Sequence, residues 1–454
     1  MHTALGQGIH AGLAAIVAEE LDADWDRVRV VDSRSNFRAY GPQMTGASNG
    51  IASNWDLMRN AGAAARAMFV EAAAIRWSVP TGAITVRDGI VSHPGSNRAA
   101  TFVELLADAS RQQPQQSPVL KQPADYRLIG TDKVRRKDSL PKSTGAQVYT
   151  QDIHRPDMLV AMVAHSPRFG GKLARFDAAD ARNVKGVVDV FAIETGVAVV
   201  AETTFAAWQG RDALRIEWDE SEAEKRSTHE LVSHYHDIAA GRSDMEPSEF
   251  TSKGDDPEVS FDGDVAEFSF DFPYLAHAPM ETLDCVAQVK GWDVSITSGA
   301  HLATLDQVQA AFAARTAPGK VDVEVVPAGG SFGRRGVMSS DYLVECVWIA
   351  KQTDGRPLKL MWSRRTRWHP AISGRCPITV CGFNWVRTGF RRAGASTAFA
   401  NRFFPWGRTP WRLKGSPIPP ISRPLRQSRA RSSPRLSRSW SAYGARSVIP
   451  IPLW

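Results

Sequence analysis

The stretch VVPAGGSFGRRG, residues 325–336, decides how this chain folds around its site. Three glycines surround a Ser–Phe pair in it: Gly329, Gly330, Ser331, Phe332 and Gly333. Glycine costs backbone entropy on folding, so such a cluster indicates positions that need a left-handed backbone or a close approach of the main chain. The stretch is either a tight turn between a strand and a helix or a loop whose bare amides hold an anion, with Arg334 and Arg335 adding positive charge.

The glycine stretch matches neither of the common phosphate-binding fingerprints. A P-loop needs four residues between its first glycine and Gly-Lys-Ser/Thr, and a dinucleotide site needs GxGxxG. Residues 325–336 contain neither pattern. The choice between a turn and an anion loop therefore depends on the rest of the chain.

The composition is that of a globular protein with room for two or three domains. The chain has 454 residues, of which 43% are apolar and 23% are charged. It contains no run of 18 apolar residues, so no membrane span is predicted, and its first 21 residues lack the basic start of a signal peptide. These features predict a cytoplasmic protein, or a periplasmic one if a leader precedes residue 1.

The cysteines do not form a cluster or zinc motif. They are scattered along the chain and include no CxxC pair: Cys285, Cys346, Cys376 and Cys381. Neither a zinc ribbon nor an iron–sulfur cluster is therefore indicated, and scattered thiols suit a reducing compartment.

Charge is divided sharply along the sequence. The whole chain has a net charge of +7, but residues 366–454 hold fifteen arginines and Lys414 without a single Asp or Glu. Residues 1–365 carry a net charge of −9. The tail is rich in Arg, Pro, Ser and Trp and has no apolar periodicity, so we expect a disordered basic tail without a packed core.

The tail has three interpretations, one of which is an unfamiliar but genuine domain, and the other two differ in function. A basic arm with aromatic residues would bind nucleic acid, whereas translation of a GC-rich gene in the wrong frame after about residue 365 would give the same bias without a selected pattern. Six scattered tryptophans favour the wrong-frame interpretation, so residues 366–454 are predicted to be non-native sequence and no nucleic-acid partner is predicted.

Helical periodicity, a hairpin turn and a stretch broken by prolines predict several domains along the chain. Apolar residues at helical spacing over 9–21 and an Ala-rich run over 54–77 predict two helices. Residues 83–93 predict a hairpin that turns at Asp88–Gly89. A polar stretch broken by prolines, 111–126, predicts a linker, after which strands and short helices alternate.

Five stretches, in fixed order, resemble the molybdopterin-binding large subunit of the xanthine dehydrogenase/aldehyde oxidase family, and most of all the branch that contains the isoquinoline 1-oxidoreductase beta subunit. The first two are LGQGIHAGLAAIVAEELDADWDRVRV and TGASNGIASNWDLMRNAGAAARAM. The third, LPKSTGAQVYTQDIHRPDMLVAMVAHSPRFGGK, is similar to the start of a hammerhead domain. The last two are YLAHAPMETLDCVAQV and AGGSFGRRGVMSSDYLVEC, and the resemblance ends at about residue 365.

The resemblance implies an α+β fold. An a/b hammerhead domain at 127–221 would lie between two parts of a molybdopterin-binding domain, 1–110 and 222–365. Residues 111–126 would link the first part to the hammerhead domain, and the second part would be incomplete before the tail at 366–454.

The resemblance also implies a cofactor site. In the family the glycine stretch lies against the molybdenum end of the cofactor, with the aromatic residue, here Phe332, on the substrate side. The residues that would bind the cofactor are Gly6, Gln7, Gly8, Thr45, Gly46, Ser48, His301, Gly329, Gly330, Ser331, Phe332, Gly333 and Arg334. Because the pterin dithiolene holds the molybdenum, no side chain, including those of His277 and Cys285, is assigned as a metal ligand. Glu281 is expected to have a structural or pocket-lining role.

Three departures from the family pattern affect this site. His301 stands where relatives have a glutamine whose amide faces the oxo group of the metal, and Ala47 and Ser331 replace glycines. The general-base glutamate of the family lies beyond the matching region, so the catalytic residue is left unassigned.

The function implied is that of a molybdenum hydroxylase subunit. It would oxidise N-heterocycles or aldehydes with water as the oxygen source, use molybdopterin cytosine dinucleotide, and pass electrons to a separate small subunit that carries [2Fe–2S] clusters. The alternative is a non-catalytic remnant that only folds or docks that partner and shows no turnover by itself.

Overall fold

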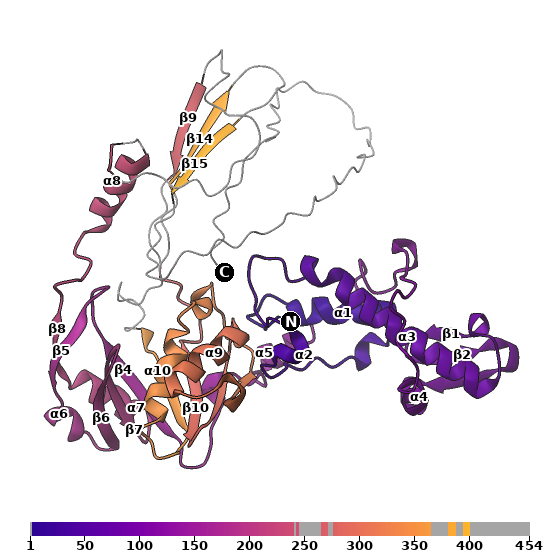
Figure 1. Ribbon diagram of the computed structural model, residues 1–454, viewed down its shortest axis with the longest axis horizontal. Helices are drawn as coiled ribbons and strands as arrows, with labels where there is room; N and C mark the ends of the chain where they lie inside the picture. Colours follow the sequence, from indigo (N-terminus) through magenta and orange to yellow (C-terminus); the bar gives the residue numbers. More distant parts are fainter. Residues whose placement is uncertain are drawn as a thin grey trace. The chain divides into compact units, whose positions relative to one another are not determined.

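A computed structural model describes residues 2–239, 242–244 and 276–364, together with the backbone of three strands at 265–270, 380–386 and 394–399 (Figure 1). The chain divides into two units. The larger comprises Met1–Lys225, Ala276–Gly374 and Ile451–Trp454, and the smaller comprises Arg226–Leu275 and Arg375–Pro450. All residues predicted to bind the cofactor belong to the larger unit.

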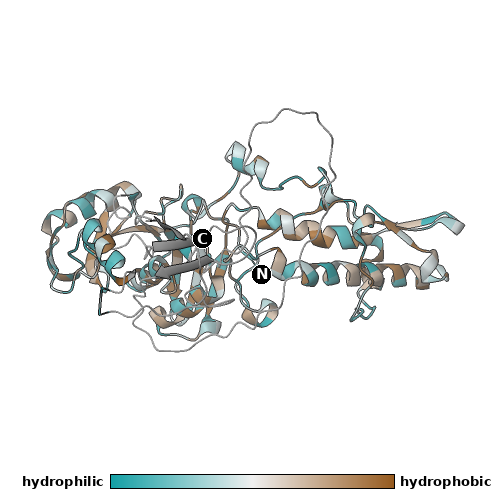
Figure 2. Ribbon diagram, turned by 90° about the horizontal axis from the view of Figure 1, so that it is seen from above, coloured by the Kyte–Doolittle hydropathy of each residue, from teal (hydrophilic) through white to brown (hydrophobic). Residues whose placement is uncertain are grey.

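Two long helices form the first part of the larger unit. They are α1 (Ile9–Leu21) and α3 (Trp55–Trp77), which lie side by side (Figure 1) and carry both apolar and polar turns (Figure 2). A Cβ atom on Gly62 would lie 2.6 Å from the backbone oxygen of Val17. The Ala-rich and Gly-containing sequence of α3 thus allows the two backbones to approach closely.

A small antiparallel sheet follows α3 and confirms the predicted hairpin. Its strands are β1 (Thr85–Arg87), β2 (Ile90–His93) and β3 (Arg98–Thr101). Arg87 pairs with Ile90, and the two residues between them have positive φ angles of 50° and 78°, as a tight hairpin turn requires. Thr101 and Glu104 then form a capping box at the start of α4 (Phe102–Ala109).

A seven-stranded sheet forms the core of the larger unit. In spatial order its strands are β12 (Val321–Val325), β11 (Asp293–Ser298), β10 (Asp284–Lys290), β13 (Leu358–Met361), β4 (Leu159–His165), β7 (Gly196–Ala201) and β6 (Val187–Ile193). Helices α9 (Ala303–Ala314) and α10 (Asp341–Ala350) contact strands β12 and β10, and α7 (Thr204–Asp212) contacts β4. A continuous buried apolar cluster joins the sheet to α9 and α10.

This sheet crosses the predicted boundary at residue 221. Strand β4 from the predicted hammerhead segment pairs in parallel with β13, with Leu159 opposite Leu358. A separate antiparallel pair, β5 (Lys172–Asp177) and β8 (Arg215–Asp219), completes the segment. The remaining short helices of the larger unit are α2 (Phe37–Tyr40), α5 (Ser139–Thr144) and α6 (Ala179–Arg182). The boundaries at 126 and 221 stay a prediction.

The smaller unit contains α8 (Thr228–Ala239) and three antiparallel strands in the order β15 (Gly394–Phe399), β14 (Val380–Val386) and β9 (Val265–Phe270). Two of these strands fall in the predicted tail, where we expected no regular strand. Val, Phe and Trp in 380–386 favour extended backbone, which accounts for the difference there. The rest of the predicted disordered tail, 366–454, lies outside the described residues.

In the part of the chain that the structure describes, no helix combines the length and the apolar character that a membrane crossing needs.

The predicted linker is tied to α1 by the buried carboxylate of Glu19. This side chain accepts hydrogen bonds from the backbone N–H groups of Leu128 and Ile129 at 2.6 and 2.9 Å and pairs with Lys121 Nζ at 3.0 Å. Burial by itself opposes ionisation, but these hydrogen bonds outweigh it and lower the pKa of Glu19. One side chain therefore holds the end of the linker against the first helix.

Glu19→Gln should lower the free energy of unfolding by about 3 kcal/mol, because an amide leaves backbone donors and Lys121 without their carboxylate. Thermal or urea unfolding at pH 7 measures the effect. Glu217→Gln is the control, since Glu217 pairs with Arg175 on the surface and the substitution should change stability far less. Equal effects of the two substitutions would contradict this account of the linker.

Candidate functional site

The topology of the seven-stranded sheet brings three segments to one edge. Strands β11 and β12 are parallel and joined by α9, so their carboxyl ends lie at the same edge, and β10 runs antiparallel to β11 and begins there. The segment before β10 contains Glu281, the segment after β11 contains His301, and the segment after β12 is Ala328–Gly336, here named the glycine loop. The fold therefore assembles a site from segments that are distant in sequence.

Arg335, whose side chain is completely buried, holds the glycine loop in place. Its guanidinium binds Glu281 Oε2 at 2.8 Å and Asp284 Oδ1 at 3.2 Å, and its Nε donates to the carbonyl of Gly330 at 3.1 Å. Burial raises the pKa of Asp284 well above its usual range. Both carboxyl groups thus lie within hydrogen-bond distance of the same buried guanidinium.

Glu281 also fixes the backbone of the glycine loop directly. Its Oε2 accepts the N–H of Gly329 at 2.7 Å, and its own N–H donates to the Gly329 carbonyl at 3.2 Å. A Cβ atom on Gly329 would lie 2.5 Å from Glu281 Cβ. The first glycine of the loop is therefore required by close packing.

The other side of the glycine loop carries strained backbone and free donors. Gly330, Phe332 and Gly333 have φ angles of 103°, 51° and 88°, which is costly for a residue with a side chain. Phe332 is 54% exposed. Among the described residues, the backbone N–H groups of Gly330 through Gly333 meet no acceptor. The loop therefore combines four consecutive amides that lack a protein acceptor with one exposed aromatic ring.

The N-terminal segments reach the same edge through backbone and hydroxyl contacts. Thr45 N–H donates to the His301 carbonyl at 3.1 Å, and Thr45 Oγ1 accepts the N–H of Thr3 at 2.9 Å. The N–H of Ala328 donates to the Ala4 carbonyl at 3.0 Å. The predicted residues near Thr45 and the glycine loop are therefore brought together.

Gln7 closes its own turn. Its Oε1 accepts the N–H of Leu5 at 2.7 Å and its Nε2 donates to the Thr3 carbonyl at 2.9 Å. Gly6 and Gly8 on either side have φ angles of 95° and 86°, and Gly8 caps α1 without a side chain. No side chain therefore caps the positive N-terminal end of α1. Both polar atoms of the Gln7 amide bind the backbone of the turn instead.

The remaining predicted residues differ in accessibility. Gly46 has open space where a Cβ would stand, and Ser48 is exposed with a φ of 52°. Arg334 is buried, pairs with Asp341 at 2.6 Å, and lies over the ring of Trp362. Its charge is therefore already compensated by protein.

His301 is buried, with 2% exposure, between these segments. Its Nδ1 lies 3.0 Å from Ser331 Oγ. Burial lowers its pKa to about 4, and a hydrogen bond with the backbone of Thr45 opposes part of that shift. The ring is therefore neutral near pH 7.

Sequence reasoning missed Arg136 and the full role of Arg335. Arg136 Nη2 donates to the Gly6 carbonyl at 3.2 Å, and its guanidinium lies 3.6 Å from the position of a Cβ on Gly8. The basic run at 133–137 was the available signal for Arg136. For the completely buried Arg335, the only signal was the two acidic residues at 281 and 284, where β10 begins.

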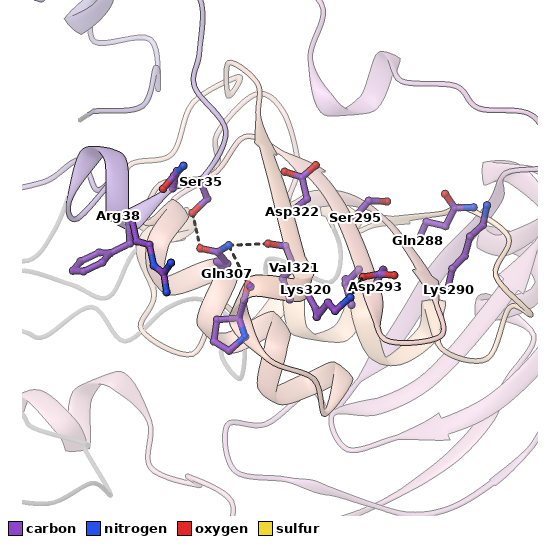
Figure 3. A pocket seen from close by; sticks show the side chains of 15 residues that line it. Ser35, Arg38, Gln288, Lys290, Asp293, Ser295, Gln307, Lys320, Val321 and Asp322 are labelled. Atoms are coloured by element: carbon purple, nitrogen blue, oxygen red, sulfur yellow. Dashed lines mark hydrogen bonds and ion pairs between the residues drawn. The ribbon is translucent and has the colours of Figure 1, made fainter.

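A hollow in the described part of the larger unit lies away from this edge. It has a volume of about 870 Å³ and lies beside β11, β12 and residues 35–38 (Figure 3). Gln307 bridges its wall by accepting from Ser35 Oγ at 3.0 Å and donating to the Val321 carbonyl at 2.7 Å. None of the predicted cofactor residues lines this hollow. The candidate site is therefore placed at the sheet edge and not in the hollow.

Two family models for the molybdopterin cofactor-binding domain match the chain, one over residues 1–153 and one over 243–403. The isoquinoline 1-oxidoreductase beta subunit of Brevundimonas diminuta is 31% identical over 88% of this chain. The chain belongs to the molybdopterin-binding xanthine dehydrogenase/aldehyde oxidase family. The match of this family continues to residue 403, past residue 365, where we expected the resemblance to end.

Other members of the family are similar over most of this chain. Membrane-bound aldehyde dehydrogenase [pyrroloquinoline-quinone] of Gluconacetobacter polyoxogenes and a nicotinate dehydrogenase subunit from Pseudomonas putida are each 28% identical, over 79% and 81% of the chain. The chain spans 57% of the length of the isoquinoline 1-oxidoreductase subunit, and 48% and 31% of the other two.

The similar solved structures share less sequence identity with this chain. Quinoline 2-oxidoreductase from Pseudomonas putida 86 has a TM-score of 0.44 at 19% identity, covering 56% of this chain and 37% of that one. The aldehyde oxidoreductase from Desulfovibrio desulfuricans has the same TM-score at 16% identity, covering 59% and 34%. The family assignment rests on the two domain matches and the sequence identity.

A buried carboxyl beside the site predicts a pH effect on stability. Asp306 in α9 accepts the Ser340 hydroxyl at 2.6 Å through Oδ1, and burial raises its pKa to about 7. Between pH 4 and 7 the folded chain keeps a proton that the unfolded chain releases, so stability should fall as pH rises through this range.

Asp306→Asn should remove this loss, which is on the order of 2–4 kcal/mol between pH 4 and 8, because an amide has no such proton to release. Unfolding midpoints at pH 5 and pH 8 measure it. Asp293→Asn is the control, because Asp293 forms an exposed pair with Lys320. In this variant stability should fall with rising pH as steeply as in the unchanged chain. An unaltered slope for Asp306→Asn would contradict the prediction.

Proposed function

We propose that this chain forms the cofactor-binding core of a molybdenum hydroxylase subunit that oxidises an N-heterocycle or an aldehyde, with water as the oxygen source. One observation carries the proposal. The sheet edge joins segments from both cofactor-binding domains, through the contacts of Thr45 with His301 and of Ala328 with Ala4. The names of the relatives, which specify isoquinoline, nicotinate and aldehyde, support this substrate class.

The residues at this edge fit an anionic pterin cofactor. The free amides of Gly330 through Gly333 and the uncapped start of α1 are hydrogen-bond donors without protein acceptors in the described part of the chain. Phosphate and pterin oxygens are the acceptors that such donors take. Gly6, Gly8 and Gly46 let the backbone come close because they carry no side chain.

When bound, the molybdenum cofactor supplies the two-electron redox chemistry. The chain itself binds and orients it: the glycine loop and Thr45 to Ser48 donate hydrogen bonds, and Phe332 lines the substrate side. Arg136 lies beside Gly8, and its guanidinium is paired with Asp138 at 2.7 Å. We propose the cytosine dinucleotide form of the cofactor for this chain.

We further propose that electrons leave through a separate small subunit with [2Fe–2S] clusters and that the protein acts in the cytoplasm. Cys285 and Cys346 are both buried in the core of the larger unit. They therefore suit packing rather than cluster ligation, which supports a partner that brings the clusters.

Cofactor loading tests the proposal. The chain should carry molybdenum and pterin in a ratio near one when purified from a host that makes the cofactor, measured by elemental analysis and by pterin fluorescence after oxidation. Gly330→Ala should reduce both roughly tenfold, because a Cβ at a φ of 103° strains the loop and approaches Pro279 within 3.1 Å.

Gly291→Ala is the matched control. Gly291 also has a positive φ, 60°, but it lies in the turn between β10 and β11 with open space around it, so loading should be unchanged. A chain that folds but carries neither molybdenum nor pterin would overturn the proposal. Loading without oxidation of a heterocycle or aldehyde in the presence of the iron–sulfur subunit would instead support the non-catalytic alternative.

A further inference from the structure

His301 occupies the junction between the two cofactor-binding domains. Residues 1–153 contribute Thr45 and residues 243–403 contribute Ser331, and His301 contacts both. Its carbonyl accepts the N–H of Thr45 at 3.1 Å, and its Nδ1 lies 3.0 Å from Ser331 Oγ. A single residue therefore bridges the loop at Thr45 and the glycine loop.

The bridge extends in both directions. Ser331 Oγ accepts the N–H of Arg335 at 3.2 Å, which connects it to the buried guanidinium. Thr45 Oγ1 accepts the N–H of Thr3, whose carbonyl accepts Gln7 Nε2. One chain of hydrogen bonds thus connects the turn at Gln7, the loop at Thr45 and the glycine loop.

The imidazole ring of His301 is closely packed against Gly336. A Cβ atom on Gly336 would lie 2.9 Å from His301 Nδ1, so the last glycine of the loop makes space for the imidazole. The serine hydroxyl that stands in place of a glycine and the imidazole contact each other directly. These two departures from the family pattern therefore form one unit.

We propose that His301 is a positioning residue that holds the loop at Thr45 and the glycine loop together as one neutral tautomer, in which Nε2–H donates to the Thr45 carbonyl and Nδ1 accepts the Ser331 hydroxyl. Nδ1 faces the Ser331 hydroxyl, and a carbonyl can only accept, so a hydrogen bond of the ring to the Thr45 backbone needs the ring proton on Nε2. The role of His301 toward the cofactor then acts through Ser331 and Thr45, and this part rests on the proposed function.

Hydrogen exchange of the chain without cofactor tests the bridge. His301→Phe keeps a ring of similar volume and removes both ring hydrogen bonds, so peptides containing the amides of Thr45 and Arg335 should exchange about tenfold faster, as for the loss of one buried hydrogen bond. His301→Gln has an acceptor and a donor at its end and should restore slow exchange. Unchanged exchange in His301→Phe, or no rescue by His301→Gln, would overturn the proposal.

A double-mutant cycle tests the direct contact. Ser331→Ala should accelerate exchange of the peptide containing Arg335, and the double variant with His301→Phe should exchange no faster than the faster single variant, because both remove the same hydrogen bond. Additive effects would mean that the two side chains act independently, which contradicts the proposal.

The tautomer can be read in the unchanged chain, so the test survives even if His301→Phe does not fold. Nitrogen-15 spectra of the histidine-labelled chain, with the His301 signal identified by its absence in His301→Gln, should show a protonated Nε2 and an unprotonated Nδ1 at pH 7. A protonated Nδ1 would overturn the proposal.

These readouts separate the bridge from the proposed function. Slow exchange and the expected tautomer in a chain that takes up no molybdenum would support the bridge and reject cofactor binding. Full loading with molybdenum together with fast hydrogen exchange in the unchanged chain would support cofactor binding and reject the bridge.

Discussion

The buried guanidinium of Arg335 is the interaction on which the site depends. An ion in the interior is tolerated only when it is paired and hydrogen-bonded, and Arg335 meets this condition with Glu281, Asp284 and the Gly330 carbonyl. The segment before β10 and the glycine loop must therefore fold together or not at all. The ion pair uses the carbonyl of Gly330 and leaves the amides of Gly330 through Gly333 without a partner in the described part of the chain.

Much of the site was predictable from the motif order and the strand pattern. The sequence places a strand, helix α9, a second strand and the glycine stretch in succession, and a parallel β–α–β unit brings residues after both strands to one edge. The meeting of His301 with the glycine loop follows from this rule. The hairpin at Asp88–Gly89 was equally predictable, because turn chemistry is local.

Other features depend on contacts that no local pattern encodes. The pairing of β4 with β13 joins residues about 200 positions apart, and the carboxylate of Glu19 binds amides that lie beyond the predicted linker. Gln7 was predicted to bind the cofactor, and no local pattern indicates that both polar atoms of its amide also bind the backbone of its own turn. Side-chain partners of this kind depend on tertiary packing, which propensity and spacing do not describe.

The positive φ of Phe332 limits which residues can replace it. Phe332 is half exposed, so a library aimed at new substrates could treat its position as freely variable. A backbone φ of 51° disfavours Val, Ile and Thr at this position whatever the substrate, whereas Asn and Gly adopt it at low cost. In the proposed function, substrate range at position 332 can therefore change through ring size or through loss of the side chain more readily than through β-branched residues.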